Sequence, residues 1–192
     1  MTTDKLGKTM KNAVKTATLA LTLGAAATLA QAQSMPPFGS DEDAAYARKI
    51  WAAMIEQRLA GPDAMFSAPY EGTDPHGMML ETFYSTATID GQTGDLVVKR
   101  NYGPVGVSAD QVLSDPEKYL GSVTVMYRRE AGFDEETKNW FWVKFLPDGT
   151  LDKNPKGMAL AGKVAKGANV GCIACHAAAP GGDYVYTSNA YE

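Results

Sequence analysis

Near its C-terminal end the chain reads Cys172-Ile173-Ala174-Cys175-His176, and these two cysteines are the only ones among its 192 residues. The C-x-x-C-H spacing is the attachment pattern of a c-type haem. Each thiol can add to one vinyl group of the porphyrin, and the adjacent His176 is positioned to bind the iron as its proximal ligand. The motif therefore predicts one covalent haem c, attached near the C-terminus.

Other chemistries also use two cysteines at this spacing. A redox dithiol is typical of a βαβ unit, and a structural zinc site needs two more ligands. The only histidine besides His176 is His76. In an oxidising compartment the two cysteines could instead form a disulfide. The adjoining histidine favours haem attachment over all three alternatives.

The first 32 residues have the pattern of a secretory signal peptide. Their basic region holds Lys5, Lys8, Lys11 and Lys15. An uncharged run rich in Ala and Thr follows at residues 16–29, and Ala30-Gln31-Ala32 matches an A-x-A cleavage site. A membrane anchor is the weaker alternative, because a spanning helix needs about 20 apolar residues. We expect a periplasmic protein that begins at Gln33, in keeping with haem c attachment outside the cytoplasm.

The remaining chain is long enough for one domain. Residues 33–39, with paired prolines, are expected to be a flexible lead-in, and residues 40–192 a single haem domain. The whole chain has a net charge of −4, and loss of the lysine-rich signal peptide makes it more negative. Nucleic acid is therefore not an expected partner, whereas a basic redox protein is.

One amphipathic helix is expected at the start of the domain. Ser40 and Asp43 form a capping pair, apolar residues then recur at helical spacing, and Gly61-Pro62 ends the segment. Period-two alternation then predicts strands at residues 78–89, 95–100, 122–129 and 140–146.

Short connections separate these strands. Turns are expected at Asp90-Gly91, Thr93-Gly94 and Asp148-Gly149, and a short helical stretch between residue 108 and Gly121. Parallel βαβ units would need longer helices between the strands. The expected fold is therefore α+β, a mainly antiparallel sheet with a few helices.

A late C-x-x-C-H motif behind a strand-rich body resembles the cytochrome P-460 family, which includes the cytochromes c-prime-beta. The resemblance extends from the helix before Gly61 to Thr187. Besides the attachment motif it depends on five segments: Pro75-His76-Gly77, residues 97–102, residues 125–127, residues 132–142 and residues 183–187. Members are small exported proteins with one haem c near the C-terminus, and the family suggests a homodimer.

Lys99 is the residue through which the resemblance bears most on function. In family members that oxidise hydroxylamine, a lysine in this strand is bonded covalently to the porphyrin edge. Alternation puts Lys99 on the same strand face as Val97, from which its long stem could reach a haem. Without the family, an ordinary solvated lysine is the favoured interpretation. The cytochromes c-prime-beta lack the bond and bind nitric oxide or carbon monoxide.

The distal side of the haem has several candidates. The resemblance implies that the strand after His76 lines the distal pocket, where Glu81 could accept protons and Phe83 could cap the iron. The alternative for either side chain is that it faces solvent or the core. His76 is expected to lie in a turn with a local hydrogen bond, and a bis-histidine site remains an alternative. Methionines could also supply a sixth ligand, although most strand methionines are core residues: Met78, Met79, Met126 and Met158.

The implied function is oxidation of hydroxylamine to nitrous oxide or nitric oxide at the haem iron, with electrons passed to another cytochrome. Lys99 and Glu81 are the candidate catalytic residues, Cys172, Cys175 and Lys99 would hold the porphyrin, and His176 would hold the iron. The alternatives are a protein that binds nitric oxide or carbon monoxide without turnover and a plain electron-transfer cytochrome.

Overall fold

The structure is a computed structural model that describes residues 37–187. The predicted signal peptide at residues 1–32 and the first part of the lead-in lie outside the described residues. The end of the lead-in is fixed to the domain. Phe38 is buried and forms a bridge with Gly162, and the Gly39 N–H donates to the Ala161 carbonyl at 2.7 Å. Flexibility is therefore the wrong description for residues 38 and 39.

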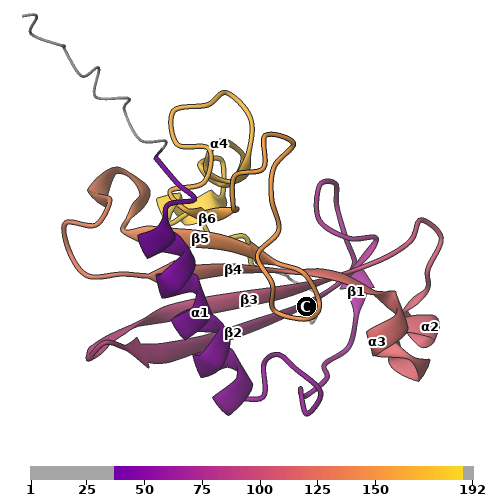
Figure 1. The fold of residues 1–192 in the computed structure, drawn as a ribbon. Coiled ribbons are helices and arrows are strands. Elements are labelled where there is room, and N and C mark those ends of the chain that lie inside the picture. The colour runs from indigo at the N-terminus through magenta and orange to yellow at the C-terminus, as the bar shows by residue number, and fades with distance from the viewer. Residues whose placement is uncertain (1–36, 188–192) are drawn as a thin grey trace, which may run out of the picture. The chain divides into compact units, whose positions relative to one another are not determined.

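Within the described residues the chain forms one six-stranded sheet in which every neighbouring pair is antiparallel and spatial order follows chain order (Figure 1). The strands are β1 (Tyr70–Glu71), β2 (Met79–Ile89), β3 (Gln92–Tyr102), β4 (Leu120–Arg128), β5 (Trp140–Phe145) and β6 (Ala161–Gly162). The helices are α1 (Asp41–Glu56), α2 (Ala109–Ser114), α3 (Pro116–Tyr119) and α4 (Cys172–His176), with 3-10 turns at Glu135–Thr137 and Pro180–Gly182. The mainly antiparallel α+β fold is confirmed.

Helix α1 begins where the sequence predicts. The Ser40 hydroxyl accepts from the Asp43 N–H at 3.0 Å, and the Asp43 carboxylate accepts from the Ser40 N–H at 3.2 Å. This reciprocal pair satisfies two N–H groups at the helix start. The helix ends at Glu56, five residues before Gly61. Within residues 37–187, no helix is long and apolar enough to cross a membrane.

Of the two turns expected between β2 and β3, the structure has only the one at Asp90-Gly91. Asp90 and Gly91 both have positive φ, as a tight two-residue turn requires. Gly94 is not in a turn but inside β3, opposite Ala87. A Cβ at Gly94 would lie 1.9 Å from the Arg128 carbonyl oxygen, so glycine is needed here for close approach of the next strand.

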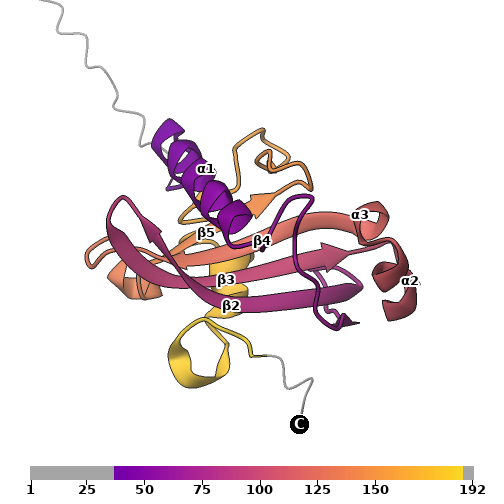
Figure 2. The same ribbon diagram turned by 90° about the horizontal axis from the view of Figure 1, so that it is seen from below.

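The two faces of the sheet carry different elements. Helix α1 packs on one face, where its buried residues join Leu96 and Val98 of β3 in the largest apolar cluster. The other face carries α4 and the C-terminal segment, drawn yellow below the sheet in Figure 2. Alternation places Trp140, Trp142 and Lys144 on this second face, and Phe141 and Phe145 toward α1.

Candidate haem pocket

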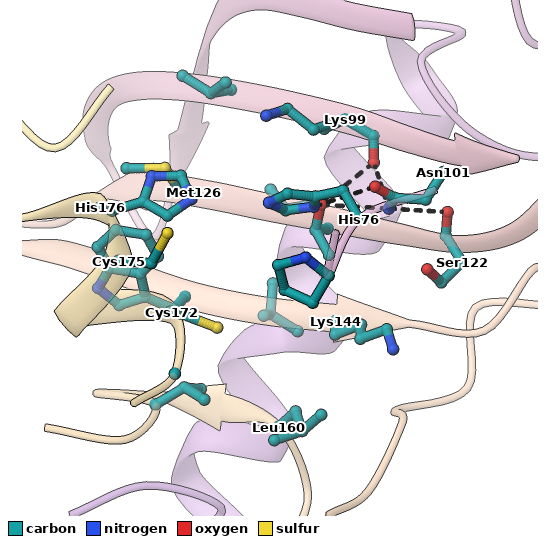
Figure 3. Close-up of a pocket in the computed structure, with 18 of the residues that line it drawn as sticks. His76, Lys99, Asn101, Ser122, Met126, Lys144, Leu160, Cys172, Cys175 and His176 are labelled. Atoms are coloured by element: carbon teal, nitrogen blue, oxygen red, sulfur yellow. Dashed lines mark hydrogen bonds between the residues drawn. The ribbon is translucent and has the colours of Figure 1, made fainter. Parts of the chain in front are cut away.

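A pocket lies between α4 and the sheet face opposite α1 (Figure 3). The space inside it, counted together with its open mouth, is about 950 Å³. Most of its surface is apolar, with Val97, Met126, Leu160 and Val164 in the walls. Polar side chains enter from a few directions, and the two cysteines are among the lining residues.

Helix α4 presents the C-x-x-C-H motif to this pocket. Ile173 is buried in the apolar cluster on this face and anchors the helix, while Cys172 and Cys175 are exposed, free thiols. Residues three apart lie on the same side of a helix, so one helical turn directs both thiols to the pocket. Within residues 37–187, no group of three or more His, Cys, Asp or Glu side chains could hold a metal ion.

His176 is held in one orientation. Its Nδ1 lies 2.7 Å from the Tyr184 carbonyl oxygen, which can only accept, so Nδ1 carries the proton and Nε2 keeps a lone pair. The rings of Trp142 and Tyr186 contact its ring edge-on, with centroid distances of 5.0 and 5.4 Å. Burial lowers the pKa of His176, which favours the neutral imidazole that binds metals.

His76 enters the same pocket from the loop before β2. The turn expected there is confirmed, since the His76 N–H donates to the Thr73 carbonyl at 2.9 Å. Its side chain forms a hydrogen bond with a residue distant in sequence: Nδ1 lies 3.1 Å from the Asn101 Oδ1. Burial, followed by the charge of Lys99, lowers the pKa of His76 to about 4.

Lys99 projects from β3 into this pocket, on the face shared with Val97, as the alternation predicts. Among the described residues its amine has no ion-pair partner. Burial lowers the pKa of Lys99, and Cys175 is the group that opposes this shift. The other pocket lysine, Lys144, differs because it forms an ion pair with Asp152 at 2.8 Å.

Glu81 is not in the pocket. It pairs with Arg100 across β2 and β3, on the face toward α1, and is 1% exposed. Its carboxylate accepts from the Ser67 N–H at 2.6 Å, from Arg100 Nη1 at 3.3 Å and from the Tyr102 hydroxyl. The expectation that Glu81 and Phe83 line the distal pocket is wrong, because the Phe83 ring also packs on this face, beneath the Arg100 guanidinium.

Several pocket residues were not anticipated. Asn101, Ser122, Thr124 and Lys144 line the polar part of the pocket, and only Met126 of the four candidate methionines lies there. Asn101 is two residues from Lys99, so alternation could have found it. The residues from β4 needed the pairing of β4 with β3, in which Thr124 lies opposite Lys99.

One buried polar atom in the described part of the chain has no hydrogen-bond partner, and it is Nε1 of Trp142. Such a group is normally paired, so its position in the pocket wall fits a site built to enclose another molecule. A c-type haem requires two thiols that attach the porphyrin, an imidazole that binds the iron and apolar walls that enclose the ring, and the pocket has all three. The residues present therefore fit a haem.

The fold is an antiparallel sheet with a few helices, and the pocket beside it fits a haem. Among known families, the model of Cytochrome P460 matches residues 79–187, which is more than half of the chain. The chain belongs to the cytochrome P460 family and is thus a haem protein. Neither the curated proteins nor the solved structures gave a match.

Proposed function

We propose that this protein is a periplasmic enzyme with one covalent haem c. It oxidises hydroxylamine to nitrous oxide or nitric oxide and passes the electrons to another cytochrome. A bound haem would supply a redox-active iron that binds small nitrogen compounds. In this proposal Cys172 and Cys175 hold the porphyrin, His176 holds the iron, and Lys99 modifies the porphyrin edge.

The observation that carries the proposal is the position of Lys99. A partly buried lysine without a carboxylate partner is uncommon, and its lowered pKa favours the neutral, nucleophilic amine. Lys99 lines the same pocket as both thiols and His176. This supports a covalent C–N bond between the Lys99 nitrogen and a carbon of the porphyrin edge, which would change the electron density of the ring. The bond would replace one N–H and one C–H bond, so two protons would leave and two electrons would pass to an external two-electron oxidant.

The remaining roles follow from the contacts of each residue. The bond from His176 Nδ1 to the Tyr184 carbonyl orients the imidazole and raises the basicity of Nε2. Apolar walls exclude water from the site and strengthen its electrostatic interactions. Glu81 has no part in the proposal, because its carboxylate lies on the other face of the sheet.

The test compares two pocket lysines. Lys99→Ala should retain its haem and still bind nitric oxide, but lose the red-shifted ferrous Soret band and most of its hydroxylamine turnover. Lys144→Ala is the matched control, because Lys144 also lines the pocket but is paired with Asp152. Its spectrum and turnover should stay near those of the wild type.

Identical spectra and equal turnover for wild type and Lys99→Ala would contradict the role of Lys99. A haem-loaded wild type that does not oxidise hydroxylamine would contradict the enzymatic proposal, and binding of nitric oxide without turnover would then be favoured if the protein binds that gas. Mapping of the haem peptide by mass spectrometry gives an independent answer, because the bond would link the Lys99 peptide to the peptide that contains Cys172 and Cys175.

A further inference from the structure

The two histidines of the chain lie together in the pocket, although 100 residues separate them in sequence. We propose that His76 is the distal ligand of the haem iron in the resting protein, opposite His176, and that a small ligand binds only after displacing it. This inference deepens the proposed function and rests on the haem attachment stated there. It makes the resting haem six-coordinate.

The separation of the two rings fits a shared iron. Their centroids lie 6.1 Å apart, and Figure 3 shows the His76 side chain pointing toward His176. An imidazole nitrogen binds a first-row transition metal at about 2 Å and its ring centre lies about 1 Å farther out, so two imidazoles on opposite sides of one iron place their centres about 6 Å apart. The observed separation of 6.1 Å agrees with this value.

Both rings also have the correct nitrogen available. The Asn101 amide donates through Nδ2 to the Lys99 and Ser122 carbonyls, each at 3.2 Å, which leaves its Oδ1 as the acceptor for His76 Nδ1. His176 Nδ1 is engaged by the Tyr184 carbonyl in the same way. In each ring Nε2 is the unprotonated nitrogen, and only Nε2 can bind iron without breaking these bonds.

The loop that carries His76 is fixed in place. The Met78 N–H donates to the Tyr102 carbonyl at 2.7 Å, and the Gly72 N–H donates to the Met78 carbonyl at 2.8 Å. A Cβ on Gly77 would lie 2.4 Å from the Tyr102 nitrogen, so the backbone next to His76 is in close contact with the end of β3. His76 is thus held in the pocket by the fold, and its displacement requires loss of the bond to Asn101.

The first experiment is spectroscopic and uses the purified haem-loaded protein without substrate. The optical spectrum should be that of a low-spin, six-coordinate haem in both oxidation states. Because the two imidazole planes are 81° apart, the ferric protein should give the strongly anisotropic low-spin EPR signal of nearly perpendicular axial imidazoles. A five-coordinate or water-bound high-spin wild type would overturn the inference.

Variants identify the ligand. His76→Ala should convert the haem to high spin, speed carbon monoxide binding to the ferrous form, and regain the low-spin spectrum when free imidazole is added. Met126→Leu is the matched control, since Met126 is the pocket methionine and the exchange preserves volume; it should stay low-spin. A low-spin His76→Ala protein, or a high-spin Met126→Leu protein, would show that His76 is not the ligand.

Haem content is measured in the same samples by staining for covalent haem after denaturing electrophoresis. Absence of covalent haem from the wild type would contradict the proposed function and remove the basis of the inference. A loaded but high-spin wild type would contradict His76 ligation alone and would leave hydroxylamine oxidation to be judged by the Lys99 variants.

Discussion

Lys99 and Arg100 are neighbours on β3 that point to opposite faces of the sheet, and their surroundings differ in kind. Arg100 is 2% exposed and fully paired: its guanidinium donates to the Leu59 and Met65 carbonyls and to Glu81. Lys99 lies in the pocket without an ion-pair partner among the described residues. On the face toward α1 the polypeptide itself supplies partners for the buried charged groups, whereas the pocket face leaves groups available for another molecule.

The unpaired groups of the pocket face support the same distinction. Trp142 has a buried Nε1–H without a partner, and both cysteines are free thiols. On the other face, the Tyr102 hydroxyl donates to the Glu81 carboxylate, and burial together with that carboxylate raises the pKa of Tyr102. Substitutions on the α1 face should therefore affect stability first, and substitutions in the pocket should affect the haem first.

The largest stability effect is expected for Glu81→Gln. The exchange preserves shape but leaves the buried Arg100 without a counter-charge, which typically costs about 3–5 kcal/mol. Urea unfolding of the haem-loaded protein measures the loss. A Glu81→Gln protein with wild-type stability but altered haem chemistry would instead indicate that Glu81 acts in the pocket.

Gly94→Ala should have the next largest effect. Its new Cβ would lie 1.9 Å from the Arg128 carbonyl oxygen, so β4 must move and the overpacking should cost about 1–3 kcal/mol. Gly121→Ala is the control, because its Cβ would be at 3.5 Å from the Asn101 carbonyl oxygen, an ordinary contact. Equal thermal midpoints for the two variants would contradict the close packing of β3 against β4.

Ser40→Ala removes the side-chain cap of α1 and should lower the free energy of unfolding by about 1 kcal/mol. The lost bond is that from the Asp43 N–H to the Ser40 hydroxyl. Ser40→Asp keeps an acceptor at the same position and should recover most of the loss. If both variants unfold at the same urea concentration, the cap does not contribute to stability.

The smallest stability effect is expected for Lys99→Met. The exchange removes an amine that has no ion-pair partner among residues 37–187 and retains much of the apolar stem, so unfolding should change by less than about 1 kcal/mol. A loss as large as that of Glu81→Gln would show that Lys99 has a structural role. The free energies of unfolding of Glu81→Gln and Lys99→Met therefore compare the two faces of the sheet directly.

The elements that local patterns specify were predicted well. Ser40 and Asp43 define the start of α1, and alternation located β2, β3, β4 and β5 to within three residues at each end. The two-residue strands β1 and β6 were missed, because they exist through pairing with distant strands and have no period of their own. Gly94 was misplaced for a similar reason, since its function is to allow contact with Arg128.

The candidate site was predicted only in part. The attachment motif is local, and the structure brings Cys172, Cys175, His176 and Lys99 to one pocket. The position of Glu81 was wrong because alternation tells which residues share a face but not which face carries the site. Only the register, in which Glu81 lies opposite Arg100, decides that.

Haem attachment itself is tested by denaturing mass spectrometry of the exported wild-type protein, with Cys172→Ala and Cys175→Ala alongside. We expect the mass of a chain that starts at Gln33 plus one haem, retained in acidified organic solvent, and a sharp fall in haem retention in each variant. A wild-type chain with the apoprotein mass, whose haem is extracted by the solvent, would contradict a covalent haem c in this pocket.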